Sequence, residues 1–183
     1  MSVKRPWVTL FSQTGSEIYN ISKTLKRVPD IIITNKSKEK IIDINQDLFY
    51  EYMDRIVWLP KKPTPIEYIQ AIPGDSLVTL HGWLRIIPPE VCEIYEIYNL
   101  HPAPLLKYPH LKGKDPQIKT FEEKLEFSGN TIHKCIAELD AGPVLAQNLI
   151  NVKDNTLEEI FSRTHKAASE LWVDFLKQKI TWI

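Results

Sequence analysis

Short apolar runs alternate with segments of helical periodicity along the first half of the chain. The runs are continuous rather than alternating, which is typical of strands buried on both faces of a parallel sheet. Between the first two runs, apolar residues recur at helical spacing from Ile18 to Val28. The predicted strands are Trp7–Phe11, Asp30–Thr34, Arg55–Leu59, Ser76–Leu80 and the run from Ile94 to Tyr98. This order predicts a doubly wound α/β fold.

The middle of this half is less regular. Between Ile41 and Ile72 we expect a short helix around Leu48, the third strand, and a helix over Pro65–Ala71 with proline in its first turn. The span is short for a full strand–helix–strand unit, so the sequence predicts a trimmed crossover. Residues 35–40 are polar and charged, and they predict a solvated loop.

The second half contains a hairpin and a long amphipathic helix. Residues 130–136 and 143–150 predict two antiparallel strands at the edge of the sheet. Thr156 and Glu159 have the spacing of a capping box, and apolar residues recur at helical spacing behind them. We therefore predict one domain over residues 1–183, a doubly wound, mostly parallel, Rossmann-like α/β sheet with an antiparallel edge strand and a long C-terminal helix.

An amide and an imidazole mark the end of the fifth predicted strand. Asn99 and His101 are two residues apart, so in extended chain both side chains point to the same side. Pro102 and Pro104 then prevent further ladder pairing and force a loop. Asp140 lies further on, at a turn. An amide donor, a titratable imidazole and a carboxylate are the groups that acyl transfer needs, as oxyanion stabiliser, proton carrier and orienting group.

These residues stand in a longer pattern. The segment Leu80–Ile87 precedes Asn99-x-His101-Pro102, and Thr131-Ile132-His133 and Leu139–Pro143 follow it. In order and spacing, the pattern from Leu80 to Gln147 resembles the folate-dependent formyltransferase superfamily, nearest to glycinamide ribonucleotide formyltransferase. The resemblance implies an enzyme that transfers a formyl group from the co-substrate 10-formyltetrahydrofolate to a primary amine of a small-molecule acceptor.

The resemblance also implies roles for single residues. Asn99 would stabilise the oxyanion, His101 would pass a proton to the leaving folate nitrogen, and Asp140 would accept the proton of the amine through water. His133 would support them from a second layer. The residues implied in folate binding are Leu84, Arg85, Ile87, Cys92 and Asp140. For the segment Trp83–Ile87, packing in the core is the alternative to lining a folate pocket.

The loop after the first strand is where the resemblance implies the acceptor's phosphate. Gly15, Ser16 and Glu17 open a helix, whose N-terminus can bind an anion, and His165 is a further acceptor contact. However, a carboxylate in the first turn repels a phosphate, and Thr14 and Glu17 also have capping-box spacing. The sequence leaves open whether this loop binds phosphate or only caps the helix.

Three features depart from the glycinamide enzyme. Glu17 stands in place of an asparagine, Ala103-Pro104 in place of a serine, and His165-Lys166-Ala167 in place of a glutamate. A site built for particular hydrogen bonds loses heavily without those partners, so we expect a different amine acceptor. The alternatives are glycinamide ribonucleotide itself, a formyltetrahydrofolate hydrolase that uses water, and a binding module without turnover. The intact set of Asn99, His101 and Asp140 argues against the last.

Composition limits the remaining classes. With 23 basic and 23 acidic residues, there is no electrostatic case for nucleic-acid binding. Two cysteines, Cys92 and Cys135, are too few for a disulfide framework, which suits a reducing cytosol. The sequence has no run of about 18 apolar residues and no signal-peptide pattern, so we expect a cytoplasmic protein that binds no membrane. We predict no metal site, because no Cys, His and Asp spacing suggests one, and either a monomer or a homodimer.

Overall fold

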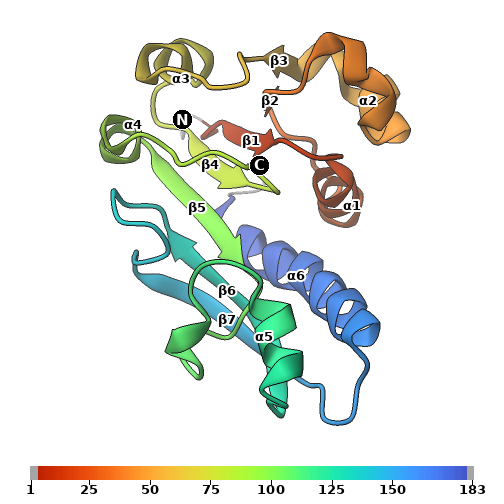
Figure 1. Cartoon of the computed structure of the whole chain (residues 1–183). Helices are drawn as coiled ribbons and strands as arrows, with labels where there is room; N and C mark the ends of the chain where they lie inside the picture. The colour runs from red at the N-terminus through yellow and green to blue at the C-terminus, as the bar shows by residue number, and fades with distance from the viewer. Residues whose placement is uncertain (1–3, 181–183) are drawn as a thin grey trace. The chain divides into compact units, whose positions relative to one another are not determined.

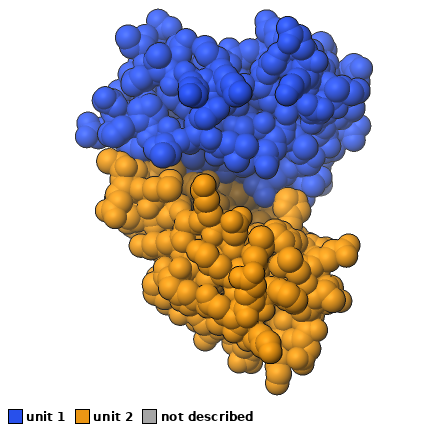
Figure 2. All heavy atoms as spheres, viewed as in Figure 1, with its two compact units in different colours: residues 1–98, 177–183 blue, residues 99–176 orange. Residues whose placement is uncertain are grey.

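A computed structural model of the chain describes residues 4–180 (Figure 1). It divides into two compact units, residues 1–98 with 177–183 and residues 99–176, which Figure 2 colours separately. The strand order is β3-β2-β1-β4-β5-β6-β7, mostly parallel with antiparallel strands at the edge. The predicted fold class is therefore confirmed, whereas the single domain over 1–183 stays a prediction.

The regular elements are short except for the last helix. The strands are β1 (Trp7–Phe11), β2 (Ile31–Thr34), β3 (Ile56–Trp58), β4 (Leu77–Leu80), β5 (Glu96–His101), β6 (Phe127–Lys134) and β7 (Val144–Asn151). The α-helices are α1 (Ser16–Leu25), α2 (Gln46–Tyr52), α3 (Pro65–Ala71), α4 (Pro89–Ile94), α5 (Pro116–Glu122) and α6 (Leu157–Lys179). Short 3-10 helices are η1 (Lys38–Asp43), η2 (Met53–Arg55) and η3 (Pro109–Leu111).

The first unit is built on parallel strands with β1 near the centre. Strand β1 pairs with β2 and β4, β2 pairs with β3, and β4 pairs with β5, all in parallel. Right-handed crossovers put the helices that lead toward β3 on one face and those that lead toward β5 on the other. Accordingly α1 contacts α2, and α3 contacts α4. The order reverses between β1 and β4, and ligands of such sheets bind at the carboxyl ends of the strands there.

Two elements differ from the sequence prediction. Helix α4 begins at Pro89 and ends at Ile94, where the sequence analysis expected a strand to start; β5 accordingly begins at Glu96. Residues 38–43 form η1, although part of them was expected to be loop. Helix α3 has the predicted bounds, because Pro65 opens it after a capping threonine.

The second unit carries the predicted hairpin and most of the long helix. Strands β6 and β7 pair antiparallel, with a register shift between Ile132 and His133. Thr156 and Glu159 form the expected capping box, since each backbone N–H donates to the other's side chain, at 2.7 and 3.2 Å. The buried residues of α6 are Ile160, Thr164, Ala168, Trp172, Val173, Phe175 and Leu176.

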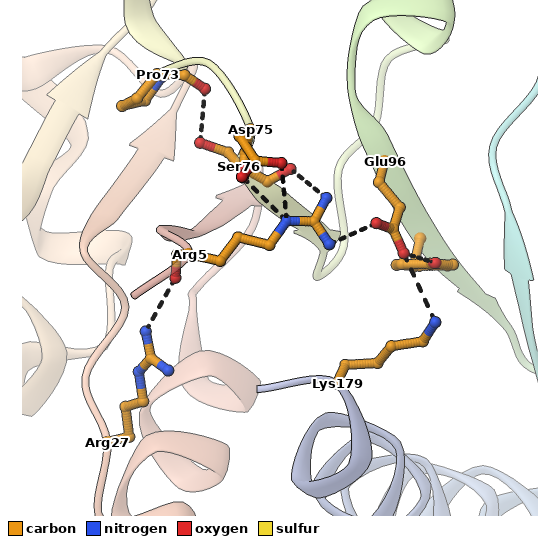
Figure 3. A network of polar contacts seen from close by, with 8 residues as sticks. Arg5, Arg27, Pro73, Asp75, Ser76, Glu96 and Lys179 are labelled. Carbon is orange, nitrogen blue, oxygen red and sulfur yellow. Dashed lines mark hydrogen bonds and ion pairs between the residues drawn. The ribbon is translucent and has the colours of Figure 1, made fainter. Parts of the chain in front are cut away.

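The last turn of α6 belongs to the first unit, where a polar network holds it (Figure 3). Arg5 Nη1 lies 2.5 Å from the Glu96 carboxylate, and Lys179 Nζ lies 3.6 Å from it. The Tyr98 hydroxyl donates to the same carboxylate. Burial raises the pKa of Glu96, but the hydrogen bonds from Tyr98 and Arg5 outweigh it and lower that pKa. Glu96 therefore stays charged and links residue 5 to residue 179.

Candidate active site

His101 is the last residue of β5, and it is 6% exposed. Its Nε2 lies 2.8 Å from the Leu111 carbonyl oxygen. A carbonyl only accepts, so Nε2 carries the hydrogen and donates it. The other ring nitrogen, Nδ1, lies 3.6 Å from Asp140 Oδ2, which is longer than a hydrogen bond. One nitrogen is thus fixed by the backbone, and the other is held near a carboxylate without being bound to it.

Asp140 lies between two imidazoles. Its φ of 53° is left-handed, a conformation that aspartate tolerates better than most residues. Two residues on, a Cβ on Gly142 would come within 1.6 Å of the Lys134 carbonyl oxygen, so only glycine fits there. The Lys134 N–H donates to the Pro143 carbonyl at 3.0 Å. These features of the turn bring the Asp140 carboxylate, 9% exposed, back against β6.

His133 reaches Asp140 from the other side. It lies at the register shift of β6 and is 3% exposed. Such a shift bends a strand and re-aims its side chains. Nε2 of His133 is 3.5 Å from Asp140 Oδ1 and has no hydrogen-bond partner within residues 4–180. The structure therefore brings His101, Asp140 and His133 together, with His133 behind the carboxylate.

The carboxylate is kept ionised by its neighbours. The contact with His133 lowers the pKa of Asp140 most. Burial opposes it, and the charges of His101 and His133 with the backbone of Gly113 lower the pKa further. Asp140 is consequently negative at neutral pH, as an acceptor of protons must be.

Asn99 shares its strand with His101. The two residues alternate on β5, so their side chains leave the same face of the strand. Asn99 is half-buried, and its side-chain amide makes no hydrogen bond among the residues that the structure describes. The amide is thus a free donor on the face that carries the imidazole.

The loop after β5 is braced by residues that sequence reasoning did not assign a role. The Thr131 hydroxyl accepts from the Leu105 N–H at 3.0 Å and donates to the Ala103 carbonyl at 2.7 Å. The Gln147 side-chain oxygen accepts from the Leu106 N–H at 2.8 Å. Both residues belong to the motif pattern, but their contacts are nonlocal, and no local signal identifies them.

The residues expected around folate lie in the first unit, apart from Asp140. Trp83 and Ile87 are buried, whereas Leu84 is 63% and Ile86 70% exposed, so the segment is partly core and partly surface. Cys92 contacts the Ile87 carbonyl through its thiol, whose pKa is raised by burial. A pocket of about 550 Å³ is lined by Ser12, Asn35, Lys36, Ser37, Lys40, Leu59, Pro60, Lys61, Leu84 and Arg85.

The predicted capping box at α1 is wrong. Gly15 is the N-cap, at φ 75°, and no side chain caps the helix. Thr14 Oγ1 instead accepts from the Ser16 N–H at 3.2 Å, and the Glu17 carboxylate lies 2.7 Å from His81 Nδ1. A partner distant in sequence thus takes the carboxylate that the local pattern assigned to the cap. His165, the other predicted acceptor contact, is exposed on α6.

Two features are absent from residues 4–180. No group of three or more His, Cys, Asp or Glu side chains there could hold a metal ion. None of the helices in this range has both the length and the hydropathy of a membrane span.

The sequence matches a known protein family and several characterised relatives. Residues 50–176, more than half of the chain, match the family described as formyl transferase. A phosphoribosylglycinamide formyltransferase of Bacillus subtilis is 31% identical over 106 residues, 56% of this chain and 53% of that protein. A methionyl-tRNA formyltransferase of Thermotoga sp. (strain RQ2) is 28% identical over 120 residues, 64% of this chain. That match spans 37% of the relative's length.

Solved structures share the fold over nearly the whole chain. The phosphoribosylglycinamide formyltransferase of Campylobacter jejuni superposes with a TM-score of 0.80 at 22% identity, over 95% of this chain and 96% of that one. A formyltetrahydrofolate deformylase of Pseudomonas syringae gives 0.72 at 21% identity, over 96% of this chain and 61% of that one. Together with the family match over residues 50–176, the fold confirms the resemblance seen in the motifs: the chain belongs to the formyl transferase family.

Proposed function

We propose that this protein transfers a formyl group from 10-formyltetrahydrofolate to a primary amine of a small-molecule acceptor. The observation that carries the proposal is the arrangement of Asn99, His101 and Asp140 in one unit. Asn99 and His101 share a face of β5, and the His101 ring lies 3.6 Å from Asp140. Membership of the formyl transferase family supports the reaction class.

The imidazole is oriented for proton transfer through one nitrogen only. Because Nε2 of His101 donates to the Leu111 carbonyl, Nδ1 is the atom that exchanges a proton during the reaction. The distance of 3.6 Å between Nδ1 and Asp140 leaves room for a substrate atom to share this nitrogen. Such contacts shorten when substrate binds. In this scheme His101 protonates the leaving folate nitrogen, and Asp140 accepts the proton of the attacking amine through water.

Asn99 stabilises the tetrahedral intermediate. Attack of the amine on the formyl carbon puts negative charge on the formyl oxygen, and the free amide of Asn99 donates to it. One such donor contributes about 2.7–4 kcal/mol in comparable sites. The requirement for an unoccupied donor agrees with an amide that makes no hydrogen bond within residues 4–180.

The donor's glutamate carboxylates bind in the pocket of the first unit. The four cations in its lining are Lys36, Lys40, Lys61 and Arg85, and the described lining contains no acidic residue. Arg85 is partly ordered already, because its Nε donates to the Lys61 carbonyl at 2.9 Å. Leu84 adds an exposed apolar surface for the folate ring system. Ile87 and Cys92 support this segment from within.

The acceptor has two candidates. Glycinamide ribonucleotide is favoured by the names of the relatives, which include phosphoribosylglycinamide formyltransferases. An amine without that phosphate is favoured by Glu17, which brings negative charge to the first turn of α1. The family match begins at residue 50, so it does not include this turn. We propose the second, with glycinamide ribonucleotide as the alternative.

The test is a steady-state assay with 10-formyltetrahydrofolate and a panel of small primary amines, glycinamide ribonucleotide included, followed by the absorbance of released tetrahydrofolate. Amine-dependent release supports the proposal, and the best amine identifies the acceptor class. Formate release that needs no amine would instead support a formyltetrahydrofolate hydrolase. Absence of both reactions, with folate still bound, would leave a binding module.

A further inference from the structure

A chain of hydrogen bonds runs from the interior of the first unit to Glu17. Trp7 Nε1 lies 3.0 Å from Thr79 Oγ1, Thr79 Oγ1 lies 2.8 Å from His81 Nε2, and His81 Nδ1 lies 2.7 Å from Glu17 Oε1. The His81 side chain is fully buried, and that of Glu17 is 18% exposed. The chain therefore begins in the core and ends at a carboxylate that solvent can reach.

The direction of each hydrogen bond follows from the groups. An indole only donates, so Trp7 donates to Thr79. The Thr79 hydroxyl can then donate its own hydrogen to His81 Nε2, which leaves Nδ1–H to donate to Glu17. In this arrangement, each of the polar hydrogens on the side chains of Trp7, Thr79 and His81 has an acceptor. The arrangement fixes the Glu17 carboxylate through Oε1 and leaves Oε2 without a hydrogen bond or ion pair among the described residues.

Glu17 stands where ligands of this kind of sheet bind. His81 follows the carboxyl end of β4, and Glu17 is in the helix that follows β1, so the pair spans the reversal of strand order between these strands. The two loops are also joined through their backbones. The Ser12 N–H donates to the Gly82 carbonyl at 3.1 Å, and the Leu84 N–H donates to the Ser12 hydroxyl at 3.0 Å. Glu17 is therefore held on the same rigid edge as the segment that begins at Leu84.

The N-terminus of α1 is poorly suited to a phosphate. The Ser16 N–H donates to the Thr14 hydroxyl, and the Ser16 hydroxyl contacts both Thr14 at 2.9 Å and the Asn45 side-chain amide at 3.4 Å. Both donors of Ser16, its N–H and its hydroxyl, are thus engaged within the protein and are not available to an anion. The fixed carboxylate of Glu17 adds repulsion, because a phosphate carries up to two negative charges at neutral pH.

We infer that Glu17 is a specificity-determining residue that binds a hydroxyl or ammonium group of the acceptor through Oε2 and rejects acceptors with a phosphate at that position. The inference rests on the proposed function, because it concerns the acceptor of the same transfer. Trp7, Thr79 and His81 are positioning residues, which act by fixing the rotamer of Glu17.

The experiment uses three matched primary amines on one scaffold that carry, at the same position, a hydroxyl, an ammonium or a phosphate. Wild type should prefer the first two. Glu17→Gln should lower kcat/KM for them by about 10- to 100-fold, the range of one hydrogen bond to a charged group, and should raise it for the phosphate. His81→Gln should shift the preference in the same direction, because the carboxylate is then no longer fixed. Glu158→Gln, exposed in the first turn of α6, is the control and should change nothing.

The outcomes separate this inference from the proposed function. If wild type and Glu17→Gln formylate the three amines with the same order of preference, the inference is wrong while the transfer stands. If neither protein formylates any amine, the proposed function fails, and calorimetric binding of the same three amines decides the inference. Equal affinities for the hydroxyl and phosphate compounds in that measurement would overturn it.

Discussion

In each unit of residues 4–180 a buried histidine lies beside a carboxylate, His81 beside Glu17 and His101 beside Asp140, and the two pairs differ in how completely they are hydrogen-bonded. His81 and Glu17 are 2.7 Å apart, and Thr79 occupies the second nitrogen of the ring. His101 and Asp140 are 3.6 Å apart, and the second oxygen of Asp140 lies 3.5 Å from another imidazole. The first pair is part of a completed hydrogen-bond chain, whereas the second is a carboxylate beside two imidazoles that form no hydrogen bond with it at these distances.

From this difference we expect the first pair to position a side chain and the second pair to transfer protons. A histidine whose two nitrogens are both hydrogen-bonded to side chains of the protein has no nitrogen left for a substrate, so we assign it the role of orienting its partner. A histidine with one nitrogen bound to the backbone and the other near a carboxylate can gain or lose a proton without breaking the fold. We therefore expect substitutions in the second unit to change kcat, and those in the first unit to change stability or acceptor choice.

The largest effect is expected from Asp140→Asn. The substitution keeps the size of the side chain but removes the charge that accepts the proton of the amine, so kcat should fall by about 10²- to 10⁴-fold. The measurement is the rate of tetrahydrofolate release at saturating substrates. Asp174→Asn, exposed on α6, is the matched control. A decrease in kcat of less than tenfold would mean that the pair of His101 and Asp140 does not carry out the proton transfer.

The next effect is expected from Asn99→Ala. Removal of the amide donor should lower kcat by about 10²- to 10³-fold and leave KM for the donor nearly unchanged, because the oxyanion exists only after attack. Asn20→Ala, on the exposed side of α1, serves as the control. An increase in KM with an unaltered kcat would show instead that Asn99 only helps to bind substrate.

The next prediction concerns the contribution of the hydrogen-bonded pair of His81 and Glu17 to the free energy of unfolding. In His81→Leu the Thr79 hydroxyl and the Glu17 carboxylate lose their shared partner, so the free energy of unfolding should fall by about 1–3 kcal/mol. His101→Leu breaks one hydrogen bond, to the Leu111 carbonyl, and none to Asp140, so it should cost less. Urea unfolding of both variants makes the comparison. Equal losses would contradict the distinction between the two pairs.

The smallest effect concerns pH. Because the pKa of Asp140 is lowered in the folded protein, its stabilising contribution is present above the unfolded value of about 3.9 and is lost as pH falls through the folded value. The difference in unfolding free energy between wild type and Asp140→Asn should therefore shrink as the pH falls below about 4. A difference that grows with acid would mean that the carboxyl is protonated more readily in the folded state.

Caps, prolines and apolar runs predicted the bounds of an element correctly where residues within that element determine them. Helix α3 has the predicted bounds because Thr64, Pro65 and Glu67 act within one turn, and β1 has them because an apolar run ends at a turn. Helix α4 was missed because six residues are too few to show periodicity, and its last residue, Ile94, continues the apolar pattern of β5. Short elements next to strands are where periodicity carries least information.

The sequence predicted which residues form the candidate site, but not the hydrogen bonds between them. The proposed catalytic residues were predicted from type, spacing and resemblance, and the structure brings His101, Asp140 and His133 together. The capping box of Thr14 and Glu17 was wrong because His81, 64 residues away in sequence, competes for the carboxylate. The hydrogen bond from His101 to the Leu111 carbonyl could not be predicted either, since any backbone carbonyl could have been the acceptor. Nonlocal hydrogen bonds decide which nitrogen is free, and one sequence does not contain them.

The network of Arg5, Glu96 and Lys179 has a consequence for biosynthesis (Figure 3). Glu96 is synthesised long before residue 179, so its carboxylate is at first paired with Arg5 and Tyr98 alone. The second unit, residues 99–176, ends before this last turn of α6. We expect a released chain that ends at Leu176 to be cleaved by protease faster in residues 1–98 than in residues 99–176.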